Sequence, residues 1–268
     1  MPKTGKGRPF LEVFASALNE DYRFPILEIF AFLYAISTFV FASFGSITAP
    51  SQGLPNEAVA YSVTTSILGT YSLIIFLVLI FKNVAYGLGS DLEKGIIQTY
   101  FSYPLKRHRI LTAKLLSALV IAIILLLTIQ ISALYVLAPD ITSQYLGIVL
   151  LTYAATLSPT LFLAGLVLLV TLVSRKGGLA LVFGIVLFFA MNIIGAIGMF
   201  IASSTGSPLA LQILAVLSPG DALSRYYYSA ELWTPTFSEV LLYVGASYAI
   251  VAFLFFLGYR YFSRRLDL

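Results

Sequence analysis

The chain has 268 residues, of which 59% are hydrophobic and only 10% are charged, and its formal net charge is +4. An ordinary soluble domain carries about 25% charged residues and about 45–50% apolar ones. Even a soluble domain of about 300 residues buries only about 75% of its chain surface, so a soluble fold could not hide this much apolar surface. The composition therefore excludes a water-soluble enzyme and predicts a protein whose main solvent is lipid. The sequence contains no cysteine, which excludes disulfides and thiolate metal sites.

Six segments without charged residues are each long enough to cross a membrane as a helix. About 20 residues cover a hydrocarbon core of roughly 30 Å, and the segments lack the alternation that a transmembrane barrel requires. Ser207–Leu217 is apolar too, but we expect it to be a short outer segment that either re-enters the membrane or lies on its surface. We therefore predict an all-α membrane protein with six transmembrane helices, at about residues 25–44, 62–82, 110–137, 147–173, 179–202 and 239–260.

The positive charges set the expected orientation of these helices. Fifteen of the sixteen Lys and Arg residues fall in segments on one side of the membrane, and only Arg225 falls on the other side. Cytoplasmic loops of membrane proteins carry an excess of Lys and Arg. We therefore expect a multi-pass protein of the cell (cytoplasmic) membrane with both termini in the cytoplasm. Because the basic balance is a topology signal, we expect membrane lipid and no nucleic acid among its partners.

The chain has no linker long enough to separate two domains, so we predict a single transmembrane domain over residues 1–268. Outside the spans it has a cytoplasmic N-terminal segment at 1–24, a cytoplasmic segment at 83–109 and an outer segment at 203–238. We predict an interfacial helix over Phe10–Tyr22 that leads into the first span. The signal is a set of apolar residues at helical spacing, namely Phe10, Val13, Phe14, Ala17 and Leu18.

The cytoplasmic segment between the second and third spans is the most informative part of the sequence. Ser90 followed by Glu93 has the spacing of a capping box, and Asp91 adds a carboxylate suited to the first turn of a helix. The pattern predicts a new helix that starts near Asp91. The helix should end by Tyr103, because the residue before Pro104 avoids the α region.

This segment also carries a resemblance to a known family. The order Glu93-Lys94-Gly95, then Pro104 followed by basic residues, then Lys114 opening the third span, is similar to the permease family of type-2 ABC exporters. The layout resembles that family as well, with an interfacial N-terminal helix, six spans, both ends inside and an extra segment before the last span. Ile96 departs from the pattern, since the family often has Thr at this position.

The resemblance implies that the chain works with partners. Two copies, or this chain and a related permease, would form the translocation path, and each would rest on a separate ATP-binding cassette subunit. That subunit would bind ATP and Mg²⁺, so no cofactor is expected on this chain. The predicted helix Asp91–Ser102 would be the coupling helix that fits a groove of the ATP-binding subunit. The residues expected to couple the two are Asp91, Glu93, Lys94, Gly95, Tyr100 and Pro104.

The sequence has no G-x-x-x-x-G-K-[ST] phosphate loop, so the chain cannot supply the ATPase itself. We expect a non-catalytic permease with no catalytic, cofactor or metal residues. Its apolar interior favours a hydrophobic or amphipathic substrate such as a lipid, a drug or a peptide.

Two other classes of protein stay open as alternatives. A secondary transporter driven by an ion gradient would place ionisable residues within its spans, and Glu28 is the one clear candidate; it could instead form a structural or gating ion pair with Arg23 or with a basic residue of another span. An intramembrane enzyme would need its base at membrane depth, whereas His108, the only histidine, lies in a basic cluster at the expected surface. Gln130 and Asn192 would either pair across helices or face a path. The candidate path or gating residues are therefore Glu28, Gln130 and Asn192.

Overall fold

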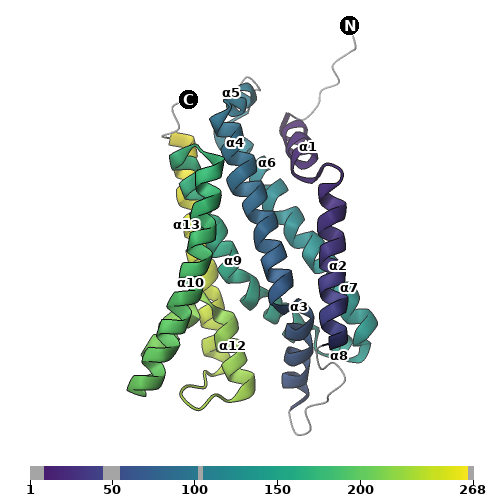
Figure 1. Ribbon diagram of the computed structural model, residues 1–268, viewed down its shortest axis with the longest axis vertical. Helices are drawn as coiled ribbons and strands as arrows, with labels where there is room; N and C mark the ends of the chain where they lie inside the picture. The colour runs from purple at the N-terminus through teal and green to yellow at the C-terminus, as the bar shows by residue number, and fades with distance from the viewer. Residues whose placement is uncertain (1–8, 45–54, 102–104, 265–268) are drawn as a thin grey trace.

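The computed structural model of the chain describes residues 9–44, 55–101 and 105–264. These residues form helices and no strand. Most of the helices run up and down in one elongated bundle (Figure 1). The first and last described residues, Pro9 and Arg264, which we call the termini, lie at the same end of it. The helices, of which η1 and η2 are π-helical, are α1 (Pro9–Tyr22), α2 (Ile26–Phe44), α3 (Asn56–Phe81), η1 (Lys82–Gly87), α4 (Leu88–Glu93), α5 (Ile96–Phe101), α6 (Arg107–Leu115), η2 (Leu116–Val120), α7 (Ile121–Leu137), α8 (Pro139–Gln144), α9 (Leu146–Ser174), α10 (Gly177–Thr205), α11 (Leu209–Leu217), α12 (Pro219–Tyr228) and α13 (Phe237–Arg264).

Among the described residues, five helical stretches are long and apolar enough to cross a membrane, and the bent pair α1 and α2 brings the number to six if it is one span. The all-helical, membrane-type architecture is thereby confirmed, and long apolar helices are present at all four positions predicted from residue 110 onward. The five stretches are Tyr71–Glu93, Arg107–Leu137, Leu146–Ser174, Gly177–Thr205 and Phe237–Arg264.

The second predicted span, at 62–82, is wrong in its bounds. α3 is broken at Gly69, whose φ of 51° and ψ of 155° are not helical. The apolar helix that follows is Tyr71–Glu93, which we call the rod. The sequence pattern ended the span at Lys82, but this charge is satisfied inside the protein, because its Nζ donates to the backbone carbonyl of Asp21 at 2.5 Å. The helix therefore continues past the charge, through η1 and into α4.

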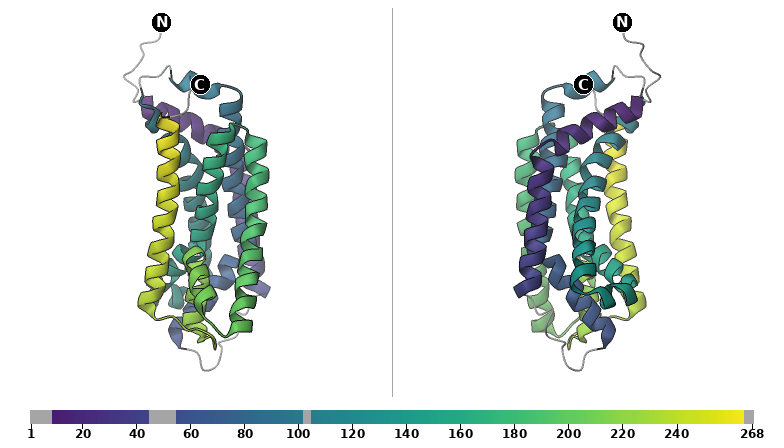
Figure 2. Two further views of the ribbon diagram at one scale, coloured as in Figure 1. Left: turned by 90° about the vertical axis from the view of Figure 1, so that its left-hand side faces the viewer. Right: turned by 90° about the vertical axis from the view of Figure 1, so that its right-hand side faces the viewer.

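The helix expected over Phe10–Tyr22 is present as α1, and its apolar face packs on protein. α1 crosses the end of the bundle (Figure 2) and makes an angle of 59° with α2. Val13 forms a small buried core with Ile110 and Ala113 of α6. Apolar packing thus holds α1 against α6, and its contact with lipid stays a prediction.

Burial differs strongly between the long helices. In the most apolar part of both the rod and α9, 61% of the residues are buried inside the protein, against 11% for α10 and 17% for α13. α13 nevertheless approaches α9 closely, since a Cβ on Gly165 would lie 3.0 Å from the Leu254 Cβ. The main core therefore lies around the rod and α9, with α10 on its outside.

The outer segment predicted over 203–238 contains a helical hairpin made of α11 and α12. The hairpin lies between α10 and α13 at the end of the bundle opposite the termini (Figure 2), and it also packs on α9. α11 has only 9 residues and turns back at Ser218, in agreement with a segment too short to cross. Ala215, Leu223 and Tyr227 of the hairpin share a second core with α3 and α9.

Candidate functional site

The segment expected to begin a helix instead ends one. Ser90 and Glu93, which have the spacing of a capping box, lie in the last turns of α4. The backbone carbonyl of Ser90 accepts a hydrogen bond from the Lys94 amide at 2.9 Å, as in a continuing helix. The preceding Gly89 does not break the helix but allows a close crossing, since a Cβ there would come within 2.4 Å of the Gly177 Cα.

The break lies at Gly95 instead. Its φ of 71° is in the left-handed region, which glycine adopts without a clash from a Cβ. α5 (Ile96–Phe101) follows at the same end of the bundle as the chain termini (Figure 1). The helix expected over Asp91–Ser102 is therefore corrected to a helix of 6 residues that starts after the glycine.

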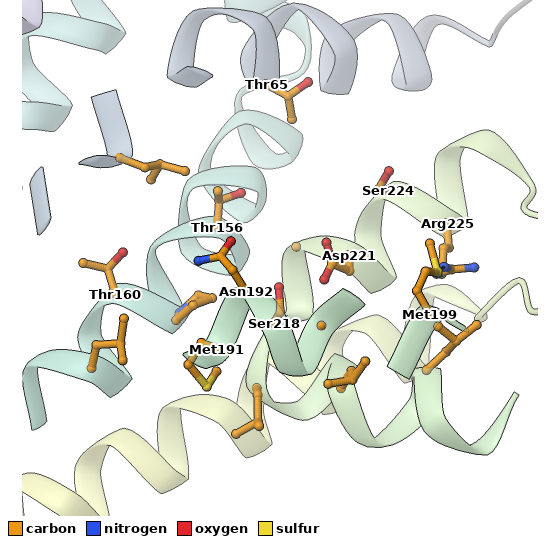
Figure 3. A pocket seen from close by; sticks show the side chains of 18 of the residues that line it. Thr65, Thr156, Thr160, Met191, Asn192, Met199, Ser218, Asp221, Ser224 and Arg225 are labelled. Carbon is orange, nitrogen blue, oxygen red and sulfur yellow. Dashed lines mark hydrogen bonds between the residues drawn. The ribbon is translucent and has the colours of Figure 1, made fainter. Parts of the chain in front are cut away.

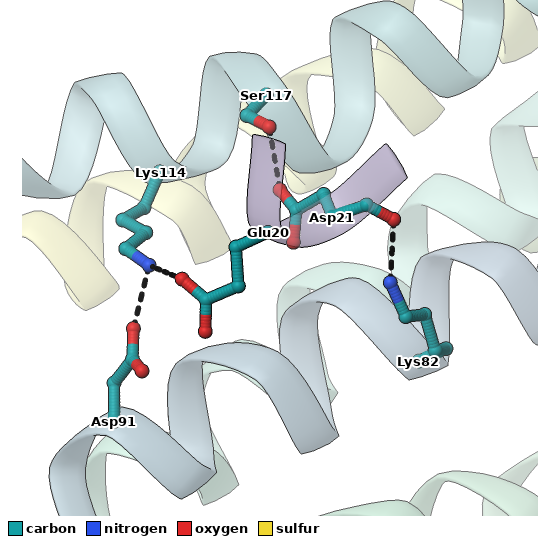
Figure 4. A network of polar contacts seen from close by, with 6 residues as sticks. All are labelled: Glu20, Asp21, Lys82, Asp91, Lys114 and Ser117. Carbon is teal, nitrogen blue, oxygen red and sulfur yellow. Dashed lines mark hydrogen bonds and ion pairs between the residues drawn. The ribbon is translucent and has the colours of Figure 1, made fainter. Parts of the chain in front are cut away.

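Asp91 belongs to an ion cluster that joins α1, α4 and α6 (Figure 4). The Lys114 Nζ lies 2.6 Å from the Asp91 Oδ2 and 2.7 Å from the Glu20 Oε2. The side chains of Lys114 and Asp91 are 7% and 1% exposed, whereas that of Glu20 is 44% exposed. Because a buried charge is tolerated only when it is paired, Lys114 offsets the burial of Asp91. Glu20 is the solvated edge of the cluster.

A second set of polar contacts fixes the end of α1 to the bundle. The Ser117 hydroxyl donates to the Asp21 Oδ2 at 2.5 Å, and the Asn83 Nδ2 donates to the Tyr22 hydroxyl at 3.1 Å. Burial raises the pKa of Asp21 to about 6, although the Ser117 hydrogen bond and two nearby lysines lower it. Sequence patterns missed these residues and Glu20, because their partners come from distant segments.

The other predicted coupling residues lie at this same end of the bundle. Glu93 and Lys94 are exposed where α4 ends, and neither forms an ion pair within the described residues. The backbone of Tyr100 is part of α5, but its side chain and the whole of Pro104 lie outside the described residues. Of the described members, Asp91 is therefore buried and Glu93 and Lys94 are exposed, and their contact with a partner subunit stays a prediction.

The three candidate path residues lie on three different helices. Glu28 is exposed in the first turn of α2 and, in the part of the chain that the structure describes, forms no ion pair with Arg23 or any other residue. The ion pair expected for it is therefore not found. Gln130 is fully buried in α7, and neither atom of its amide has a hydrogen-bond partner among the described residues. Asn192 donates from Nδ2 to the Phe188 carbonyl of its own helix at 2.8 Å and lines a cavity.

This cavity has a volume of about 870 Å³ and lies between α3, α9, α10 and the α11–α12 hairpin. Small-molecule pockets in proteins have volumes of about 300–1,000 Å³, so the cavity can hold a ligand of that class. Leu73, Leu77 and Leu163 belong to its apolar wall. Its polar residues (Figure 3) are Thr65, Thr156, Thr160, Asn192, Ser218, Asp221, Ser224 and Arg225.

α3 is broken where it passes the cavity. Tyr61 and Thr65 line the cavity before the break at Gly69, and Leu73 and Leu77 line it after the break. No atom lies within 4 Å of the position that a Gly69 Cβ would take. Irregular backbone at membrane depth is tolerated only where it is buried in protein or lines a cavity. The break therefore lies between two parts of α3 that both line the cavity.

Asp221 and Arg225 are the charged residues of this cavity, and the sequence placed both in the outer segment. They lie one turn apart on α12, and no ion pair joins them. The Arg225 Nη2 contacts the Met199 Sδ at 3.0 Å. Their i, i+4 spacing signals a shared helix face, but the sequence does not show which helices enclose the space before it.

The structure offers no alternative centre of metal chemistry within the described residues, where no group of three or more His, Cys, Asp and Glu side chains is placed to hold an ion. His108 is exposed near the start of α6. No protein-family model matches the chain, and no curated protein sequence matches it. Its function is therefore inferred from its own residues and their placement.

Proposed function

We propose that this chain is the transmembrane subunit of an ATP-driven ABC exporter. With a second copy or a related permease, it forms the translocation path for a hydrophobic or amphipathic substrate such as a lipid, a drug or a peptide. A separate ATP-binding cassette subunit binds ATP and Mg²⁺ and docks at the end of the bundle that carries α5. That end, with both chain termini, faces the cytoplasm.

The observation that carries the proposal is the rod, because it links the proposed docking end to the cavity. Leu73 and Leu77, near one end of the rod, line the cavity. Gly95 and α5 follow directly at its other end. A partner that pushes on α5 would shift the rod along its axis, and this shift would reshape the cavity wall.

The ion cluster supports the same mechanism, since it ties the rod to its neighbours. Lys114 holds Asp91 of the rod and Glu20 of α1 at once. Removing one partner of a buried ion pair costs several kcal/mol, on the order of 3–5. The rod, α1 and α6 would therefore respond to the partner subunit as one unit.

The distribution of positive charge supports the proposed orientation. Arg225 lies on α12, at the end of the bundle opposite the termini (Figure 1). An excess of Lys and Arg marks the cytoplasmic side of membrane proteins. The basic residues at the helix ends near α5 are Lys94, Lys106, Arg107, Arg109, Arg175, Lys176, Arg260 and Arg264.

A secondary transporter driven by an ion gradient is the second candidate, and the observation that favours it is Asp221 in the cavity wall. Ion-coupled carriers place ionisable residues on their substrate pathway. An intramembrane enzyme has less support, because the single histidine, His108, is exposed near the start of α6.

Affinity purification of the tagged chain from its native membrane tests the proposal. The chain should bring down a protein with a Walker phosphate loop, and liposomes that contain both should transport substrate only when ATP is supplied. A chain that moves substrate in liposomes without a partner and without ATP would overturn the exporter and favour the carrier.

A charge reversal beside α5 tests the docking site. Glu93→Lys changes an exposed residue at the end of α4, and we expect it to weaken binding of the ATPase or to uncouple ATP hydrolysis from transport. Glu231→Lys is the control, because Glu231 is also exposed but follows α12 at the opposite end of the bundle. Equal effects of the two reversals would contradict docking at α5.

A further inference from the structure

The wall of the cavity changes in character along the bundle. Toward the middle of the bundle it is formed by Leu73, Leu77 and Leu163. Toward the end opposite the termini it carries Tyr228, at the end of α12, and Trp233, in the segment that follows. A wall of this kind fits a ligand that is apolar at one end and polar at the other.

The two charged side chains of the cavity can form more hydrogen bonds and ion pairs than they do. A guanidinium has five N–H donors, whereas a thioether sulfur is only a weak acceptor. Within the described residues, the contact with Met199 is the one hydrogen bond of the Arg225 side chain. Asp221 is exposed and forms no ion pair in the same part of the chain. The cavity therefore presents a positive and a negative group that do not neutralise each other.

We propose that the cavity binds a zwitterionic amphiphile. Arg225 binds its anionic group, Asp221 binds its cationic group, and the apolar chain lies along the leucines of the wall. A ligand with only one charge makes one of these two charge-assisted contacts and not the other, which lowers its affinity relative to a zwitterion. Tyr228 and Trp233 add aromatic faces, to which ammonium groups bind.

A zwitterionic amphiphile would be the substrate of the proposed exporter, and its role as cargo rests on that proposed function. Binding to the cavity requires neither ATP nor a partner subunit. A failure of the binding test and a failure of the docking test are therefore separate results.

Trp233 makes the binding measurable, because it is the only tryptophan of the chain and lines the cavity. The full chain, held in amphipol, is titrated with four probes that share a dodecyl chain: dodecylphosphocholine, dodecyl phosphate, dodecyltrimethylammonium and dodecyl maltoside. We expect dodecylphosphocholine to change the Trp233 emission at a concentration about tenfold below that of the other probes, as one charge-assisted contact implies. Equal midpoints for the four probes would overturn the proposal.

Two substitutions test the assignment of the charges. Arg225→Gln should raise the apparent Kd of the two phosphate-bearing probes about tenfold and leave dodecyltrimethylammonium unchanged. Asp221→Asn should weaken the two ammonium-bearing probes and leave dodecyl phosphate unchanged. Arg175→Gln, at the other end of the bundle, is the control and should change neither. Unaltered headgroup selectivity in both cavity variants would overturn the assignment.

A third variant separates the cavity from the surrounding amphiphile layer. Gly195 lines the cavity, and no atom lies within 4 Å of the position that its Cβ would take. Gly195→Leu therefore fills open space without a backbone clash and should remove the Trp233 response to every probe. A response that persists in this variant would place the probes outside the cavity and overturn the site.

Discussion

The helices on the two sides of α9 differ in how closely their side chains pack and in whether their charged side chains form ion pairs. On one side, α1, α6 and the rod form the packed half, where buried charges are paired and side chains fill the space between helices. On the other side, α10 and the α11–α12 hairpin form the open half, which encloses the cavity together with the walls that α3 and α9 supply. Lys114 in the packed half contacts two carboxylates, whereas Arg225 in the open half contacts a thioether. Specific contacts are thus concentrated where we propose that the partner docks, and the opposite half keeps room for a ligand.

If paired buried charges stabilise the packed half, loss of its buried cation should lower the free energy of unfolding strongly. Lys114→Met removes the ion pair of Asp91, whose side chain is 1% exposed, and we expect the free energy of unfolding to fall by about 3–5 kcal/mol. Unfolding of the purified chain in detergent, followed by circular dichroism, measures this loss. Lys94→Met is the exposed control, with an expected change within about 0.5 kcal/mol. Recovery of stability in Lys114→Met combined with Asp91→Leu would identify the unpaired carboxylate as the cause.

Truncations on α9 and α10 compare the two halves directly. Leu168 of α9 is fully buried, and the Cβ of a residue replacing Gly258 on α13 would touch it at 3.0 Å. We expect Leu168→Ala to cost about 2–5 kcal/mol because it leaves a cavity. Ile197→Ala, at a position that is 52% exposed on α10, should cost well under half as much in the same unfolding assay. Equal losses would show that α10 is packed as tightly as α9.

Two glycine substitutions are expected to change stability less, and they differ in whether the new Cβ meets a neighbouring helix. Gly89→Ala places a Cβ about 2.4 Å from the Gly177 Cα, so the rod and α10 must move apart, and we expect a loss of about 1–3 kcal/mol. Gly178→Ala changes the next residue of α10, where no atom lies within 4 Å of the new Cβ. That variant should be neutral or slightly stabilising, since alanine favours a helix more than glycine does. Thermal unfolding of both variants decides whether the crossing is as close as the structure indicates.

The smallest effect is expected at the edge of the ion cluster. Glu20→Gln removes a carboxylate that is 44% exposed, and pairs of exposed charges contribute less than about 1 kcal/mol. Lys114 keeps its buried partner in this variant, so the free energy of unfolding should change little. A loss as large as that of Lys114→Met would mean that Glu20, and not Asp91, neutralises the lysine.

The sequence predicted the helical, membrane-type fold well, because long apolar runs carry that information locally. The third to sixth apolar helices appear where expected. The second failed at both ends, because the break at Gly69 and the satisfaction of Lys82 by the Asp21 carbonyl depend on contacts across the bundle. The capping-box pattern at Ser90 failed for the same reason, since Gly89 meets Gly177 from a distant helix and the segment stays helical.

Much less of the candidate site could be predicted. Asp91 was expected to contact a partner subunit, and the structure turns it inward to Lys114. From the sequence, Asn192 could either pair across helices or face a path. Its position in the cavity wall depends on five helices that meet around one space. Asp221 and Arg225 looked like residues of an outer loop, because a short apolar segment followed by Ser218 and Pro219 gives no sign of a hairpin that folds back against the bundle.

The position of the ion cluster in the sequence allows it to form early during synthesis of the chain. Its three members, Glu20, Asp91 and Lys114, all come before the end of α6. Synthesis begins at the N-terminus, so these residues leave the ribosome before the rest of the chain. Every charge of the cluster can therefore find its partner before α9 has left the ribosome. The contact of Gly89 with Gly177 forms only later, so the second half of the protein is added to a first half in which the ion cluster can already be paired.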